Sequence, residues 1–196
     1  RVWDVASGTP VHTLSLPGLG CSVALSATGT LLAVGCSEGR VALFDVAKDY
    51  TPLSTFTAHD GKSGSWFRLC FHPSSALLAT SSTKDNDAKV WDISNAADSV
   101  VVAAAAAGGG AGAAPKLVAV MRGHTAGISD VRFSAVGALI ATASRDKTVK
   151  VWDAVTGREL QTLTVTGSTD PSVAFHPTDC VLASTGCGTS ARIWMA

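Results

Sequence analysis

Short apolar stretches separated by polar turns run along the whole chain, and helical periodicity is not evident in any of them. Four stretches open a recurring unit: Cys21–Leu25, Phe67–Phe71, Ile128–Phe133 and Ser172–Phe175. A turn and a second run of small and aliphatic residues follow each one: Leu31–Gly35, Leu77–Ser81, Leu139–Ala143 and Val181–Thr185. Runs rich in Val, Leu and Ala, bounded by Gly, Pro, Ser and Asp, favour β-strands. The pattern therefore predicts an all-β fold.

A third run in each unit carries an aromatic residue, and Asp follows it in all but the last. The aromatic residues are Trp3, Phe44, Trp91, Trp152 and Trp194, which lie 41, 47, 61 and 42 residues apart. A fourth, more polar run follows: Val11–Leu14, Leu53–Phe56, Leu117–Met121 and Glu159–Leu163. A period in the low forties is typical of the four-stranded antiparallel blades of a β-propeller. The longest interval holds an Ala/Gly-rich segment, which explains its excess.

One unit carries the clearest motif, Arg122-Gly123-His124 followed by Ser144-Arg145-Asp146-Lys147 and Trp152-Asp153. With this motif the sequence resembles the WD-repeat β-propeller family over nearly its whole length. The resemblance implies a structural tetrad of hydrogen-bonded side chains: His124, Thr142, Asp146 and Trp152. In it, Asp146 accepts from the His124 ring, and Thr142 links His124 to the Trp152 indole. Such a network matters because an unpaired buried donor costs about 1–3 kcal/mol.

The other units depart from this motif. The second has His59, Asp85 and Trp91, with either Thr80 or Ser81 in the hydroxyl position. The first has Phe44 for Trp and Glu38 at the turn, whereas the last has Trp194 but Gly188 at the turn, and neither has the His. We expect the repeats that depart from the pattern to be held by packing rather than by the polar network.

The predicted strands group into one domain, residues 1–196, with repeats at about 1–14 (partial), 15–56, 57–121, 122–163 and 164–196. They number seventeen, too few for the seven four-stranded blades that the resemblance implies. The chain therefore reads as a partial arc of four to five blades of a larger ring. We expect its flanks, around Val23, Leu32, Val173 and Leu182, to need cover from missing blades or another protein. The low-complexity segment 96–115 is expected to form a surface loop.

Composition and charge narrow the classes of partner and the compartment that we expect for this chain. The chain is 46% apolar and 15% charged, with a net charge of zero. A neutral chain argues against direct nucleic-acid binding through a basic surface. No apolar run is long enough for a membrane-spanning helix. The chain begins at Arg1 without a signal-peptide pattern, so we expect a fragment of a longer intracellular protein, cytoplasmic, cytoskeletal or nuclear. Its five cysteines lack the paired spacing of a zinc site and are expected to be buried small hydrophobes.

No catalytic constellation emerges, so we expect no enzyme activity, cofactor, metal or small-molecule substrate. The favoured function is a non-catalytic protein–protein interaction scaffold within a multiprotein complex, with other proteins as partners. The alternative is the propeller domain of a larger enzyme-linked protein or a substrate-recruiting adaptor, for example one associated with a ubiquitin ligase or a kinase. The candidate partner-facing turn residues are Arg145, Lys147, Lys84 and Asp85. Solvated turn charges are the competing interpretation of the same residues.

Overall fold

The computed structural model describes residues 1–60, 66–97, 114–165, 170–179, 181–186 and 190–195. These residues contain seventeen β-strands, a 3-10 turn at Ser37–Gly39 and one α-helix, α1 (Ser94–Ala97). The predicted all-β fold is confirmed. The sequence did not predict α1 because a helix of one turn has no periodicity to detect.

The strands form three complete four-stranded antiparallel sheets, a three-stranded sheet and a hairpin. Blade 1 contains β3 (Gly20–Leu25), β4 (Leu31–Cys36), β5 (Arg40–Asp45) and β6 (Thr51–Thr57). Blade 2 contains β7 (Phe67–Phe71), β8 (Leu77–Ser82), β9 (Ala88–Asp92) and β10 (Lys116–Met121). Blade 3 contains β11 (Ile128–Phe133), β12 (Leu139–Ser144), β13 (Thr148–Asp153) and β14 (Glu159–Thr164). Blade 4 contains β15 (Val173–Phe175), β16 (Val181–Thr185) and β17 (Ala191–Met195), and the hairpin pairs β1 (Val2–Trp3) with β2 (Pro10–His12).

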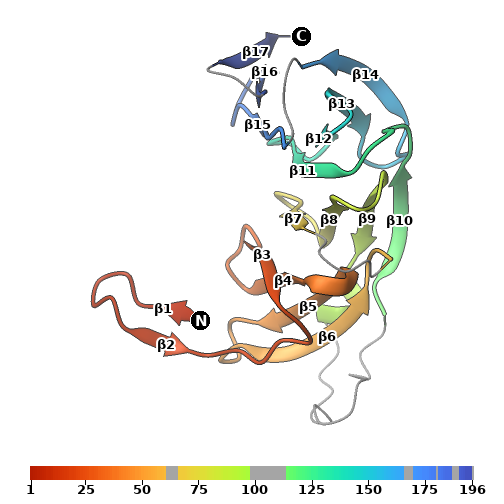
Figure 1. Cartoon of the computed structure of the whole chain (residues 1–196). Coiled ribbons are helices and arrows are strands. Elements are labelled where there is room, and N and C mark those ends of the chain that lie inside the picture. Colours follow the sequence, from red (N-terminus) through yellow and green to blue (C-terminus); the bar gives the residue numbers. More distant parts are fainter. Residues whose placement is uncertain (61–65, 98–113, 166–169, 180, 187–189, 196) are drawn as a thin grey trace.

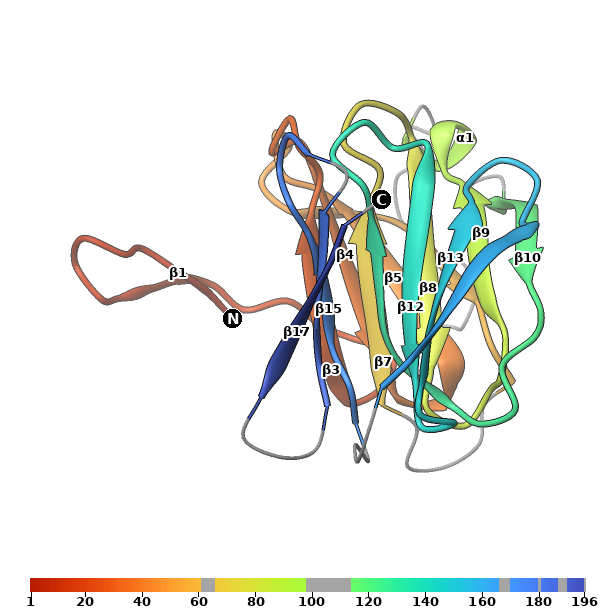
Figure 2. The same cartoon turned by 90° about the horizontal axis from the view of Figure 1, so that it is seen from above.

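The blades follow one another around an arc that stays open in the part of the chain the structure describes (Figure 1). The first strands of neighbouring blades, β3, β7, β11 and β15, contact one another in that order. The β1–β2 hairpin stands away from the blades (Figure 2). The prediction of a partial propeller arc is therefore confirmed, whereas the exact repeat boundaries drawn from the sequence stay a prediction.

The repeated aromatic residues occupy equivalent places on the third strand of each blade. Each lies opposite the second residue of the preceding strand, in the pairs Phe44–Leu32, Trp91–Leu78, Trp152–Ile140 and Trp194–Leu182. The same register in four sheets shows that the sequence period corresponds to a structural period.

Most of the hydrophobic core lies between neighbouring blades. One cluster joins blades 1 and 2, a second joins blades 2 and 3, and a third joins blades 3 and 4. Leu32, Val173 and Leu182 are already buried by other residues of this chain, so the expectation that they need cover from missing blades or another protein is wrong. Leu14 and Leu16 pack against the cluster that contains Leu32, while blade 3 covers the other two.

Other apolar side chains at the two flanks do reach solvent. They are Val23 and Leu25 on β3 and Ile193 and Met195 on β17. Most of the Ala/Gly-rich segment, 98–113, lies outside the described residues, as do Cys180 and Cys187, so the expectations for them are not addressed. That segment connects β9 to β10, the third and fourth strands of blade 2.

We predict that Gly127→Ala destabilises the protein more than Gly29→Ala. A Cβ on Gly127 would collide with the backbone of Thr83 in the neighbouring blade, which no side-chain rotation can relieve. Gly29 has a φ of +70° and open space around it, so alanine there costs only about 1 kcal/mol of backbone strain. Overpacking at Gly127 should cost roughly 2–3 kcal/mol, measured by urea unfolding. An equal or smaller loss at Gly127 would contradict the tight contact between blades 2 and 3.

Candidate functional site

Four side chains of blade 3 form a continuous hydrogen-bonded network. His124 Nδ1 lies 2.7 Å from Asp146 Oδ2, and His124 Nε2 lies 2.7 Å from Thr142 Oγ1. The Trp152 indole N–H donates to Thr142 Oγ1 at 2.8 Å. Because Thr142 Oγ1 accepts from Trp152, its own proton is left to donate to His124 Nε2. The Nδ1–H of a neutral His124 then donates to Asp146.

The surroundings favour a neutral imidazole beside an ionised carboxylate. Burial lowers the pKa of His124, against the opposing effect of the hydrogen bond to Asp146. Burial by itself would raise the pKa of Asp146, but hydrogen bonds from the Thr148 hydroxyl, the Thr125 N–H and His124 together lower it. At neutral pH the network therefore contains a neutral His124 and an ionised Asp146, so it buries no positive charge.

Blade 2 contains the same network, which corrects the expectation that it is held by packing alone. His59 Nδ1 lies 2.7 Å from Asp85 Oδ2, and His59 Nε2 lies 2.9 Å from Thr80 Oγ1. The Trp91 indole N–H donates to Thr80 Oγ1 at 3.0 Å. Thr80 and not Ser81 therefore fills the hydroxyl position. The Ser81 hydroxyl is buried and has no hydrogen-bond partner among the described residues.

The two outer blades keep less of the network. In blade 4 the Trp194 indole N–H donates to Ser184 Oγ at 2.9 Å, so one polar link remains where packing alone was expected. In blade 1, Phe44 carries no donor, and Glu38 pairs with Arg40 at 2.9 Å. Phe44 is buried among apolar neighbours, as expected for a blade held by packing.

The candidate turn residues divide into two kinds. Asp85 accepts from His59 and so belongs to the blade 2 network. Arg145 binds Asp170 of the segment leading into blade 4, with both Nε and Nη2 at 2.8 Å from Oδ1. Lys84 and Lys147 extend into solvent. All four residues lie in the β8–β9 and β12–β13 turns, which occupy the same end of their blades; we call this end, together with the residues entering β7, β11 and β15, the turn face.

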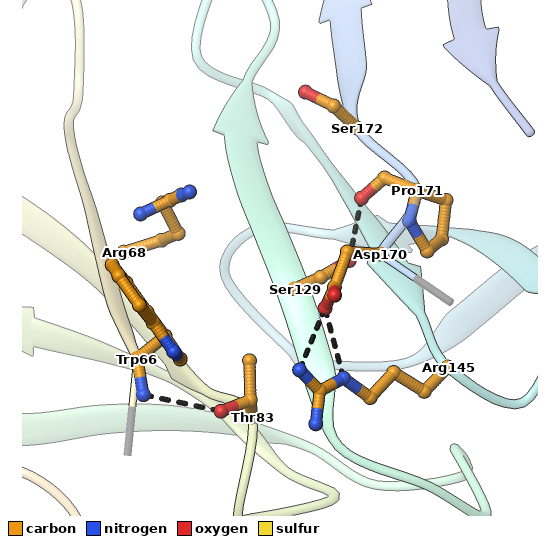
Figure 3. Close-up of a pocket in the computed structure, with 8 residues that line it drawn as sticks. All are labelled: Trp66, Arg68, Thr83, Ser129, Arg145, Asp170, Pro171 and Ser172. Atoms are coloured by element: carbon orange, nitrogen blue, oxygen red, sulfur yellow. Dashed lines mark hydrogen bonds and ion pairs between the residues drawn. The ribbon is translucent and has the colours of Figure 1, made fainter. Parts of the chain in front are cut away.

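A pocket of about 230 Å³ opens on the turn face where blades 2, 3 and 4 meet (Figure 3). Trp66 and Arg68 line one side, while Arg145, Asp170, Pro171 and Ser172 line the other. Trp66 is 60% exposed although it is among the largest side chains of the protein. An exposed tryptophan beside charged groups in a concavity is a feature of protein-binding surfaces.

Most polar groups of the pocket are already bound within the protein. The Ser129 hydroxyl donates to the Pro171 carbonyl, and the Trp66 backbone N–H donates to Thr83 Oγ1. The hydroxyl and the backbone nitrogen that follow Pro171, Ser172 Oγ and Val173 N, donate to Asp130 Oδ2. The bonds of Ser129 and Asp130 connect blade 3 to blade 4.

The Arg68 guanidinium is the exception among these groups. It donates to the Phe67 carbonyl at 3.3 Å, and no carboxylate of the described residues lies within 4.0 Å of it. The repeat pattern of the sequence does not single out Trp66, Arg68 or Asp130. The signals that could have found them are a Trp outside the repeat position and charged residues inside otherwise apolar first strands.

Histidines and cysteines elsewhere have structural surroundings. His72 Nδ1 accepts from the backbone N–H groups of Ser74 and Ser75, and His176 caps its own turn in the same way. Cys36 is buried and Cys70 is half buried, both as thiols. Burial raises the pKa of both thiols. Within the described ranges, no three His, Cys, Asp or Glu side chains gather as a metal site would require. No helix in the same ranges has the length and apolar character needed to cross a membrane.

Comparisons with known proteins agree with this geometry. The family model described as "WD domain, G-beta repeat" matches residues 50–92, 115–153 and 157–195. Transducin beta-like protein 3 of Mus musculus is 27% identical over 175 residues, 88% of this chain and 18% of the relative. Nuclear distribution protein PAC1 of Arthroderma benhamiae is 33% identical over 130 residues, 62% of this chain and 24% of the relative. Among solved structures, the β-propeller domain of Cps50 (Swd1) from Myceliophteria thermophila matches 90% of this chain and 54% of its own, with a TM-score of 0.70 and 17% identity.

The matched repeats cover more than half of the chain, so the protein belongs to the WD-repeat family of β-propellers. Members of this family are typically protein-interaction modules or components of complexes. The chain spans less than a quarter of the length of either curated relative.

We predict opposite effects for two neighbouring hydroxyls of β8. Thr80→Ala should destabilise the protein by about 1–3 kcal/mol, because it leaves the Trp91 N–H and His59 Nε2 without partners. Ser81→Ala removes a buried hydroxyl that has no partner and should leave stability unchanged or raise it. Thermal unfolding of the two variants measures the difference. Equal losses would show that the blade 2 network contributes nothing specific.

We also predict that stability falls with acid in two stages. Burial lowers the pKa of His124 in the folded protein, so the unfolded chain takes up that proton first and stability declines as pH drops below about 6.5. A hydrogen bond from His59 lowers the pKa of Asp85 from 3.8 to about 2, so its contribution is present above pH 4 and is lost toward pH 2. Melting temperatures between pH 7 and pH 2.5 measure both stages. Asp85→Asn should be less stable at pH 7 and should lose less below pH 4, and a flat wild-type profile would contradict both assignments.

Proposed function

We propose that this chain is part of a non-catalytic protein-interaction scaffold, a WD-repeat subunit of a multiprotein assembly that holds partner proteins on its turn face. The observation that carries the proposal is the pocket at the meeting point of three blades, with a Trp side chain 60% exposed at its wall. Three elements of a rigid arc position this pocket, so its shape does not depend on one loop.

The hydroxyls of the pocket support a binding function over a catalytic one. Ser129 and Ser172 donate to a carbonyl and to a buried carboxylate, and Thr83 accepts from a backbone N–H. None of the three contacts a histidine or lysine base among the described residues, whereas nucleophilic catalysis by a hydroxyl needs such a base. Charges of both signs surround the pocket, which supports protein partners rather than nucleic acid. The free thiols of the buried Cys36 and the half-buried Cys70 support an intracellular compartment.

A second candidate is the propeller domain of a larger enzyme-linked protein or of an adaptor that recruits substrates. The observation that favours it is the length of the relatives, of which this chain matches 18% and 24%. In that case the turn face would hold the substrate protein and another part of the protein would supply the activity.

Partner purification from the native cells tests the proposed function. Lys84→Glu combined with Lys147→Glu reverses two exposed charges of the turn face. The matched control, Lys48→Glu combined with Arg158→Glu, reverses two charges in the β5–β6 and β13–β14 turns at the opposite end of the blades. Quantitative mass spectrometry should show at least one partner that the wild type and the control retain and that the turn-face variant loses at least fivefold. Identical partners for all three proteins would refute binding through the turn face.

A further inference from the structure

The pocket on the turn face has one cationic group left for a ligand. The guanidinium of Arg145 is bound to Asp170, so these two charges cancel across the far wall. Arg68 stands on the near wall beside Trp66, and no carboxylate of the described residues lies within 4.0 Å of its guanidinium (Figure 3). The lining residues therefore carry one net positive charge, located at Arg68.

The place of Arg68 in the fold makes this charge unusual. Arg68 lies on β7, the first strand of blade 2, between the buried side chains of Phe67 and Leu69. Asp130 holds the corresponding register position on β11, since Arg68 precedes Leu69 opposite Thr80 and Asp130 precedes Val131 opposite Thr142. Asp130 is buried and bound to Ser172, Val173 and Arg132. Of these two charged first-strand residues, Asp130 is used to join blades and Arg68 is not.

We propose that this pocket binds the side-chain carboxylate of a glutamate or aspartate in an acidic peptide segment of a partner protein. A guanidinium presents parallel N–H groups that match a carboxylate, and the exposed Trp66 face offers apolar contact for the peptide around it. The single net charge matches a carboxylate of charge −1 better than a phosphate of charge about −2. This inference rests on the proposed function, because it names the chemistry that the same face recognises.

Peptide titration of the isotope-labelled 196-residue chain tests the inference, after circular dichroism has shown that each variant is folded. The probes are acetyl-Gly-Ser-Glu-Ser-Gly-amide, the same peptide with Gln for Glu, and the same peptide with phosphoserine for Glu. The readout is the indole N–H resonance of Trp66, which Trp66→Phe identifies. The Glu peptide should shift this resonance to saturation, and the Gln peptide should bind at least tenfold more weakly.

Arg68→Gln should weaken the Glu peptide at least tenfold, whereas Lys116→Gln, which removes one exposed charge from the outer strand β10, should change it less than twofold. An unchanged affinity for Arg68→Gln, or no shift with any peptide, would overturn the inference. Tighter binding of the phosphoserine peptide by tenfold or more would overturn it in favour of phosphopeptide recognition. Partner purification with the lysine variants is independent of Arg68, so a loss of partners there together with a flat titration here would retain the proposed function and reject only the carboxylate pocket.

Discussion

Each blade of this arc is apolar on both faces of its sheet, and the rest of the structure depends on covering both. The three large core clusters all lie between neighbouring blades, and the smaller fourth cluster covers the free face of blade 1 with Leu14 and Leu16. Burial of apolar area is the main stabilising contribution to folding, and here most of it is available only when blades stack. The tight passage of Gly127 along the Thr83 backbone shows how closely two blades approach.

The polar networks supply hydrogen-bond partners for donors that this stacking removes from water. Trp91 and Trp152 each place an indole N–H on the third strand, where the neighbouring strands exclude water. Thr80 and Thr142 satisfy those donors, and a histidine with its aspartate completes each network. Blade 1 has Phe44 in the same place and therefore no indole donor to satisfy. A blade can thus form with the shorter network of blade 4 or with no network.

The turn face contains side chains that neither the stacking of the blades nor the polar networks require. Asp85 and Asp146 form hydrogen bonds with histidines. Asp130 and Asp170 bind residues at the junction of blades 3 and 4. Trp66 and Arg68 contribute little to either, and both line the same pocket. Side chains that are exposed and uncommitted on a rigid scaffold are the ones that a partner can contact at small cost in ordering.

The sequence by itself determined the blade order, the strand types and the blade 3 network, because period, turn residues and the motif around Asp146 are local signals. It left Thr80 and Ser81 as alternatives, since adjacent residues of a strand face opposite sides and only the packed sheet shows which side holds His59. It also predicted that Leu32 and Leu182 need cover from missing blades or another protein, whereas Leu14, Leu16 and blade 3 cover them. The pocket was decided by tertiary structure alone: Trp66, Arg145 and Asp170 are far apart in sequence and meet only because the first strands of consecutive blades pack side by side.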